Sequence, residues 1–402
     1  MGPSGTRAGL FVKQVAGYRA FIPAPLPPDP PVHLDAPMSA LLSRADQAVG
    51  RLDGVVYTLP AADMFVAMYV RREAVLSSQI EGTQSSLDDV LTFELDPKGR
   101  EVPRDVEEVV NYVRAMNYGL ERLTTLPLSN RLIREIHQIL LQGVRGASKQ
   151  PGEYRTSQNW IGAGNVPLER AAFVPPPVAE MWPALDNLQW FMHEERSLPV
   201  LVHCGLAHAQ FETIDPFLDG NGRVGRLLIT FLLSYRGILH RPLLYLSAFL
   251  KGHRAEYYDR LTAVREQGDW EGWLRFFLRG VAETAEEAAT TARSIVHMRE
   301  THRMLVQERN LGLNGLRLLD LLFHYPVVNV RLVEDRLGVA FVTASKLVKQ
   351  FEALDFVVEV TGGKRSRRFH YVPYLRLFAE PDVEPHQAVP LQTTEDGELA
   401  HP

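Results

Sequence analysis

The feature that most constrains this chain is a proline followed closely by two glycines, between two apolar stretches. Pro216 disfavours the α-helical region for Asp215, so a helix that arrives from the N-terminal side has to end there. Gly220 and Gly222 permit a tight turn, and from residue 223 onwards apolar residues recur at helical spacing. The sequence therefore predicts a helix that ends near Asp215 and a second helix that begins just after the turn.

The start of the second helix carries the residues of a polyphosphate site. Free N–H groups and the helix dipole favour an anion there. Arg223 and Arg226 lie three residues apart, on one face of the first turn, and Asp219 offers a hard oxygen suited to Mg²⁺. A capped helix with Asp219 or Asn221 as N-cap is the alternative, but capping requires neither the second glycine nor both arginines. The turn therefore predicts a site for a polyphosphate with Mg²⁺.

The same stretch resembles the signature of the Fic family (filamentation induced by cAMP), His-Pro-Phe-x-Asp/Glu-Gly-Asn-Gly-Arg-x-x-Arg. The matching positions are Pro216, Phe217, Asp219, Gly220, Asn221, Gly222, Arg223 and Arg226. At one position the chain departs from the signature, because Asp215 stands where the family has its catalytic histidine. The resemblance covers roughly residues 40–290. It implies a protein adenylyltransferase, which transfers AMP from ATP to a Ser, Thr or Tyr hydroxyl of a protein target.

The resemblance also implies roles for individual residues. The nucleotide-binding residues would be Gly220, Asn221, Gly222, Arg223, Arg226 and Tyr258. Asp219 would bind Mg²⁺, and Asp215 would stand in for the general base, a role worth roughly 10²–10⁴-fold in rate. Aspartate has a reference pKa of about 3.9, against about 6.5 for histidine. Since it is also shorter, we expect a weaker base and an impaired transferase. Tyr257 and Tyr258 are adjacent on a predicted helix, so a core role for either stays open.

A second stretch, residues 77–82, resembles the inhibitory segment of that family, Ser/Thr-x-x-x-Glu-Gly/Asn. Ser77 and Glu81 lie four residues apart, on one face of a helix predicted over residues 61–80. The resemblance implies that Glu81 pairs with Arg226 in the place of the nucleotide's γ-phosphate, so that ATP binds in a non-productive pose. Because the segment precedes the signature, the chain resembles the subclass with N-terminal self-inhibition. A solvated helix end is the alternative.

The rest of the sequence predicts a mostly α-helical protein of several domains. We expect a Pro-rich, polyproline-like arm at residues 1–36, an N-terminal helical region with the inhibitory segment at 37–125, and a Fic-type core at 126–310. Residues 143–177 break the helical pattern, and short apolar pieces such as 172–174 suit a small β-hairpin. The resemblance implies a flap there, which aligns the target by main-chain pairing. An ordinary surface loop is the alternative.

Residues 311–378 show the pattern of three helices followed by a two-stranded hairpin, which resembles a winged helix-turn-helix domain. The predicted wing carries a basic cluster of Lys364, Arg365, Arg367 and Arg368. Such a cluster suits a DNA backbone, and a role in dimerisation or target docking is the equal alternative. The domain supports a rival hypothesis for the whole chain, a non-catalytic, nucleotide-sensing DNA-binding regulator. The polar, acidic tail at 379–402 is expected to be disordered.

Composition narrows the class of protein. The chain has 402 residues, 46% of them hydrophobic, which is ample for a sizeable core. Its net charge of −5 gives no overall attraction to nucleic acid or membrane, although a local basic patch stays open. One cysteine, Cys204, excludes an intrachain disulfide and a multi-cysteine metal site.

The sequence also bounds the location and leaves several questions open. We expect no transmembrane helix and no signal peptide, and therefore a cytoplasmic protein. Self-modification and a homodimer both stay open as alternatives.

Overall fold

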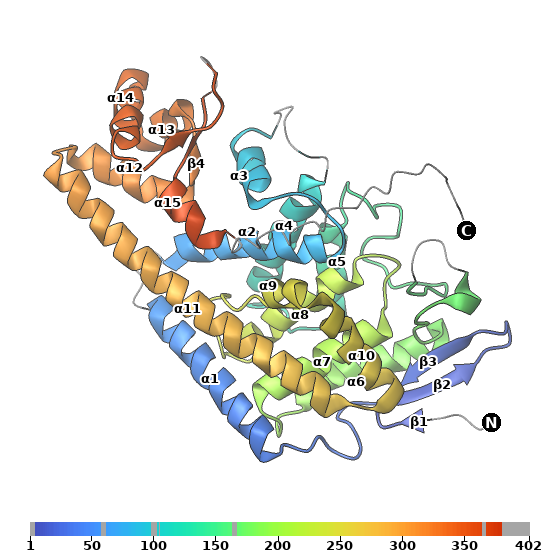
Figure 1. Ribbon diagram of the computed structural model, residues 1–402. Helices are drawn as coiled ribbons and strands as arrows, with labels where there is room; N and C mark the ends of the chain where they lie inside the picture. Colours follow the sequence, from blue (N-terminus) through green and yellow to red (C-terminus); the bar gives the residue numbers. More distant parts are fainter. Residues whose placement is uncertain are drawn as a thin grey trace, which may run out of the picture.

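In its described residues the chain folds into a mostly helical body, as predicted, which also carries small antiparallel sheets (Figure 1). The computed structural model describes residues 5–57, 62–97, 103, 105–162, 167–363 and 367–379. The helices of the first half are α1 (Ala36–Tyr57), α2 (Ala62–Ile80), α3 (Leu87–Leu95), α4 (Val106–Arg122), α5 (Asn130–Leu140), α6 (Val178–Glu194) and α7 (Val200–Ile214). Those of the second half are α8 (Asn221–Tyr235), α9 (Ser247–Gly252), α10 (Arg254–Gln267), α11 (Trp270–Glu308), α12 (Gly312–His324), α13 (Val330–Leu337), α14 (Phe341–Glu352) and α15 (Val372–Leu375).

The core is built around α7, which is buried along nearly its whole length. Buried residues lie around its whole circumference, a pattern typical of a helix surrounded by other helices. Helices α6, α8, α10 and α11 pack against it. The long helix α11 packs along α1 and then continues away from the core towards the C-terminal helices (Figure 1). None of the helices in the described ranges combines the length and the apolar character that crossing a bilayer requires.

The N-terminal residues form a sheet that the proline-rich composition did not predict. Strands β1 (Gly5–Thr6), β2 (Gly9–Lys13) and β3 (Arg19–Pro23) pair in antiparallel order, with Phe11 opposite Phe21. The expectation of a polyproline-like arm over residues 1–36 is therefore wrong for this part, because the prolines cluster after β3. Apolar residues in both strands supply the buried side chains, and Phe21 is fully buried.

A main-chain hydrogen bond joins this N-terminal sheet to the region predicted to be a flap. The Phe21 N–H donates to the Val174 carbonyl at 2.9 Å. Next to it, Ile161 and Phe173 exchange two main-chain hydrogen bonds of 2.8 and 3.1 Å. Among the described residues of this segment, this isolated bridge stands where the β-hairpin was expected, with a 3₁₀ turn at Leu168–Arg170 between its two sides. The flap is backed by a sheet of a distant part of the chain.

The C-terminal residues form a separate unit of helices α12 to α14 and a three-stranded antiparallel sheet, which we call the C-terminal module (residues 311–378). Strands β4 (Val327–Val328), β5 (Val358–Glu359) and β6 (Phe369–His370) pair in the order β4–β6–β5. Gly338, in the left-handed conformation, forms the turn between α13 and α14. Lys364 and Arg365 of the basic cluster, and the acidic tail from Glu380 onwards, lie outside the described residues.

The C-terminal module rests on the helix that carries the predicted inhibitory segment. Helix α12 packs against α2. The Phe378 ring meets the Tyr69 ring edge-on at 5.3 Å, and His370 Nδ1 lies 3.2 Å from Asp88 Oδ1 of α3. One side of α2 thus faces the module.

The packing of α4 on α8 gives a first prediction. It compares Gly119, which lies in this contact, with Gly50, which lies in α1 away from it. A Cβ on Gly119 of α4 would overlap the Phe231 ring of α8, whereas a Cβ on Gly50 of α1 would meet open space. We expect Gly119→Ala to lower the free energy of unfolding by about 1–3 kcal/mol through overpacking. The control Gly50→Ala should raise it by up to about 1 kcal/mol, because alanine favours helix. Urea unfolding of the two variants measures this, and a loss of the same size in both would contradict it.

Candidate functional site

The site lies where α7 ends and α8 begins. Asp215 follows α7 in the left-handed conformation, with φ 48° and ψ 61°. Among residues other than glycine, Asn, Asp and His adopt this conformation most readily, so the backbone accommodates both the family's histidine and this aspartate. Gly220 is also left-handed, and α8 starts at Asn221. The turn predicted from Pro216 and the two glycines is confirmed.

Side chains from two helices close this turn. Asn221 Nδ2 donates to the Phe217 carbonyl and Asn221 Oδ1 accepts from the Phe217 N–H, both at 2.8 Å. From α5, the His137 ring stacks on the Phe217 ring at 3.7 Å, and His137 Nε2 lies 2.9 Å from the Asp219 carbonyl. The Gly152 N–H donates to His137 Nδ1, so Nε2 carries the proton. Burial lowers the pKa of His137 to about 4, which keeps the ring neutral. No pattern in the sequence singled out this histidine.

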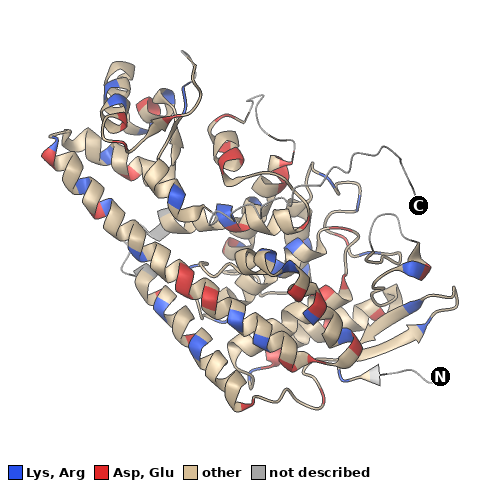
Figure 2. Ribbon diagram, viewed as in Figure 1, with Lys and Arg blue, Asp and Glu red and all other residues tan. Residues whose placement is uncertain are grey.

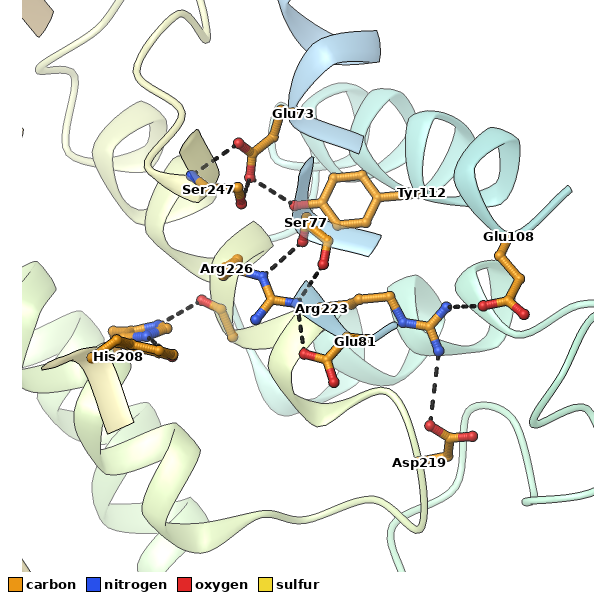
Figure 3. A network of polar contacts seen from close by, with 12 residues as sticks. Glu73, Ser77, Glu81, Glu108, Tyr112, His208, Asp219, Arg223, Arg226 and Ser247 are labelled. Carbon is orange, nitrogen blue, oxygen red and sulfur yellow. Dashed lines mark hydrogen bonds and ion pairs between the residues drawn. The ribbon is translucent and has the colours of Figure 1, made fainter. Parts of the chain in front are cut away.

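The first arginine of the motif is buried and turned towards a carboxylate from another helix. Arg223 Nη1 lies 3.4 Å from Glu108 Oε2 of α4, and Arg223 Nη2 lies 3.8 Å from Asp219 Oδ1 (Figure 3). The Arg223 side chain is 2% exposed and that of Asp219 is 37% exposed. Asp219 therefore stands at the mouth of the site with a cation behind it. Glu108 was missed by the sequence analysis, because it lies 115 residues away along the chain.

The second arginine meets the predicted inhibitory segment. Arg226 Nε donates to Ser77 Oγ at 2.7 Å, and Arg226 Nη2 donates to the Ser77 carbonyl at 3.0 Å and to Glu81 Oε1 at 2.8 Å (Figure 3). Although burial by itself disfavours charge, the guanidinium holds the pKa of Glu81 below its ordinary value. A Cβ at Gly222 would overlap the Glu81 carboxylate, so this glycine is needed for the approach. The structure brings together the two stretches that the sequence singled out separately.

A buried carboxylate lies two turns further back on α2. Glu73 Oε1 accepts from Ser247 Oγ at 2.6 Å and from the Tyr112 hydroxyl at 3.2 Å, and Glu73 Oε2 accepts from the Ser247 N–H at 3.2 Å (Figure 3). Burial raises the pKa of Glu73 to about 7. Residues 73, 77 and 81 thus form one polar face of α2 and its C-terminal end, which is fixed against α4, α8 and α9.

The carboxyl group at the family's histidine position is itself buried. Asp215 is 8% exposed, and its Oδ2 accepts a hydrogen bond of 2.6 Å from Asn159 Nδ2. Burial raises the pKa of Asp215 to about 7, against the opposing pull of Arg155 and Arg265. The expectation of a weaker base rested on the ordinary pKa of aspartate, and burial moves the pKa of this carboxyl group close to that of a free histidine. The shorter side chain and the negative charge still distinguish Asp215 from the histidine of the family signature.

The adjacent tyrosines separate into two roles. Tyr257 is buried, and its hydroxyl lies 2.9 Å from His208 Nε2 of α7. Tyr258 is 41% exposed, and the Arg254 guanidinium lies 5.9 Å from the centre of its ring. Only Tyr258 is therefore placed to offer a ring face to a ligand, while Tyr257 belongs to the core.

The arrangement suits a metal that is brought in with a polyphosphate. The described part of the chain holds no group of three or more His, Cys, Asp or Glu side chains that could form a cage for a metal ion. Mg²⁺ commonly takes one or two carboxylates and fills its remaining positions with water and phosphate oxygens. Asp219, half-exposed beside a helix N-terminus, fits this type of ligation, in which the nucleotide supplies the other oxygens.

Curated relatives of this chain share part of its length. It is 31% identical over 157 residues to the protein adenylyltransferase Fic of Aedes aegypti, which is 38% of this chain and 27% of that protein. It is 29% identical over 182 residues to a probable protein adenylyltransferase of Aquifex aeolicus, which is 44% of this chain and 51% of that protein. The chain thus spans only about a quarter to a half of the length of these relatives.

The fold and the sequence profiles agree with these similarities. The crystal structure of a Fic family protein from Desulfovibrio desulfuricans superposes with a TM-score of 0.56 at 20% identity, over 85% of this chain and 97% of that one, which shows a shared fold. Residues 39–121 match the sequence profile described as Fic/DOC family N-terminal, and residues 127–233 match that of the Fic/DOC family. The chain therefore carries Fic/DOC family domains over residues 39–121 and 127–233.

Proposed function

We propose that this chain is a protein adenylyltransferase that transfers AMP from ATP to a hydroxyl of a protein target. The observation that carries the proposal is the start of α8, where Asp219, two glycines and a buried arginine surround a helix N-terminus, with the ionisable Asp215 before the turn. Relatives described as protein adenylyltransferases support the same reaction.

The residues of the turn bind the nucleotide in this proposal. The N–H groups from Gly220 to Gly222 and the Arg223 guanidinium hold the phosphates, and Asn221 keeps the turn in shape. Mg²⁺ on Asp219 would neutralise phosphate charge. The ring of Tyr258 would line the adenine of the nucleotide.

Asp215 acts as the general base in this scheme. It takes the proton of the target hydroxyl, whose oxygen attacks the α-phosphorus of ATP. The new bond joins that oxygen to phosphorus, and the bond from the α-phosphorus to the pyrophosphate oxygen breaks. A left-handed backbone at residue 215 and the raised pKa support this role.

Glu81 limits the reaction in this proposal. Its carboxylate holds Arg226 through a 2.8 Å ion pair, so the guanidinium is not available to the γ-phosphate. ATP would then bind with its triphosphate out of line for attack. Ser77 adds two hydrogen bonds to the same guanidinium and keeps it on the inhibitory segment.

The base role of Asp215 predicts a pH dependence. Since only the ionised carboxylate accepts a proton, the transfer rate should rise with pH through about 7. Asp215→Asn should lower the rate about 10²–10⁴-fold. Asp215→His should raise it, because imidazole is longer and adds no negative charge. Incorporation of labelled AMP into the chain and into lysate proteins, in the Glu81→Gly background, measures this. Equal labelling by the parent and Asp215→Asn would refute the role of Asp215.

The inhibitory role of Glu81 predicts tighter productive binding once it is removed. Hydrogen bonds to charged groups contribute about 1.5–3 kcal/mol, so Glu81→Gly should tighten Mg²⁺–ATP binding roughly tenfold or more in calorimetry. In the Asp215→His background it should also increase labelling. Glu94→Gln is the matched control, because Glu94 pairs with Arg71, another arginine contact of α2. If affinity and labelling stay unchanged in Glu81→Gly, self-inhibition by this residue is excluded.

A second candidate function is DNA binding by the C-terminal module, which we interpret as a winged helix-turn-helix. Its ten Lys and Arg against six Asp and Glu give +4, whereas the remaining 33 basic and 42 acidic residues of the chain give −9. Helix α14, the second helix of the predicted helix-turn-helix, exposes Lys346 and Lys349. The blue segments of the ribbon in Figure 2 mark where Lys and Arg lie along the chain. A basic module on an otherwise acidic chain is the observation that favours this candidate.

The DNA candidate predicts salt-dependent binding through α14. Lys346→Glu/Lys349→Glu should weaken binding of a mixed-sequence duplex, and the slope of affinity against salt should flatten by about 0.9 for each phosphate that the protein no longer neutralises. The control is the double variant Lys13→Glu/Lys149→Glu, which changes the net charge by the same amount at exposed positions outside the module. Fluorescence anisotropy measures both. No duplex binding at low salt, or an equal loss in the control, would exclude the candidate.

A further inference from the structure

Asn159, at the flap, reaches across to the residue proposed as the base. Its side-chain nitrogen Nδ2 lies 2.6 Å from Asp215 Oδ2, 3.2 Å from the Asp215 carbonyl and 3.0 Å from the Phe217 carbonyl. All three acceptors belong to the turn between α7 and α8. The amide therefore fixes the Asp215 carboxylate relative to the main chain of the turn that carries it.

The segment that carries Asn159 is itself firmly held. The Arg155 N–H donates to the Pro216 carbonyl at 2.9 Å, and Arg155 Nε donates to the Asp215 carbonyl at 3.0 Å. Gln158 Nε2 donates to the Pro175 carbonyl at 3.0 Å, on the other side of the flap. Asn159 therefore lies between the turn and the flap residues Val174 and Pro175. The Val174 carbonyl accepts the hydrogen bond from Phe21 of β3.

The charges around Asp215 show what this amide adds. Arg155 and Arg265 favour the ionised carboxylate, whereas burial and the carboxylates of Glu81 and Glu212 oppose it. Arg155 reaches the Asp215 carbonyl, and the hydrogen bonds of Arg265 go to α7, at the Glu212 carbonyl and Thr213 Oγ1. The short hydrogen bond to the carboxylate oxygen comes from Asn159.

We propose that Asn159 is the positioning residue for the side chain at 215: it aims the carboxylate into the site, stabilises its ionised form and ties its orientation to the flap. Ile161, two residues on, pairs with Phe173 and is 46% exposed, so it lies at the side of the flap where an extended target segment would dock. The segment that would receive the target would thus also orient the base. Nothing in the sequence marked Asn159, because its partner is 56 residues away.

The direct test follows the ionisation of Asp215 and does not need transfer activity. In the full chain labelled with ¹³C-carboxyl aspartate, the signal missing from Asp215→Asn identifies Asp215. Removing a donor to the carboxylate favours the neutral form, so Asn159→Ala should move the titration of this signal to higher pH. Asn159→Asp, which keeps the size of the side chain but adds a like charge, should move it further. Gln158→Ala removes the neighbouring flap amide, which bonds main-chain carbonyls and not the Asp215 carboxylate, so it should displace the titration less than Asn159→Ala does.

Two results would overturn the inference. One is an unchanged titration of Asp215 in a folded Asn159→Ala protein. The other is an equal displacement in Gln158→Ala, which would mean that the flap as a whole, and not this amide, sets the environment.

A second readout rests on the proposed function. In the Glu81→Gly background, the pH profile of AMP transfer by Asn159→Ala should move in the same direction as the titration, and the rate near pH 6.5 should fall about five- to tenfold. KM for ATP should not change, since the hydrogen bonds of the Asn159 side chain go to Asp215 and Phe217 and not to the residues assigned to the phosphates. A displaced titration with no transfer in any variant would refute the proposed function and leave the positioning role standing. A displaced titration with an unchanged rate profile would refute the link between Asn159 and the base.

Discussion

A buried guanidinium on the first turns of α8 is the constraint on which the site depends. Arg226 is almost fully removed from water, and a buried cation is costly unless an anion and hydrogen bonds compensate it. Helix α2 supplies both through Ser77 and Glu81. The position of α2 is therefore coupled to α8, and a phosphate that replaced Glu81 would satisfy the same cation. In the proposed function, two anions that compete for one buried arginine would be the physical basis of self-inhibition.

The turn between α7 and α8 depends on a second buried arginine. The last carbonyl groups of a helix have no partner within it. Arg155 is fully buried and donates to the carbonyls of Ile214 and Asp215, at the end of α7, and to that of Pro176 in the flap. This joins the helix end directly to the flap. The same buried environment raises the pKa of Asp215, so the scaffold that shapes the turn also determines how basic the carboxylate is.

Helix α2 connects regions that lie far apart in the sequence. Its face at residues 73, 77 and 81 meets α4, α8 and α9, and Tyr69 meets Phe378 at the end of the C-terminal module. On the face of α2 that carries residues 73, 77 and 81, Tyr112 and Ser247 donate hydrogen bonds to Glu73. The predicted inhibitory segment is therefore the end of a helix that is fixed along its length, and not a solvated helix end.

The sequence by itself determined the local chemistry of the site. Pro216 and the two glycines set the turn, because they restrict or free the backbone at their own positions. The spacing of Ser77 and Glu81 placed both on one helical face. These constraints act over a few residues, so one sequence is enough to identify them. The helical fold class followed from apolar residues that recur at helical spacing.

Only the tertiary structure decided which distant groups complete the site. Glu108, His137 and Asn159 carry no local signal, since each meets the turn from another element. The contact of the N-terminal sheet with the flap was hidden because it joins Phe21 and Val174, which are 153 residues apart. The basicity of Asp215 was expected from its residue type to be low, but burial reversed this. Desolvation depends on everything packed around a group, and no pattern within its own segment determines it.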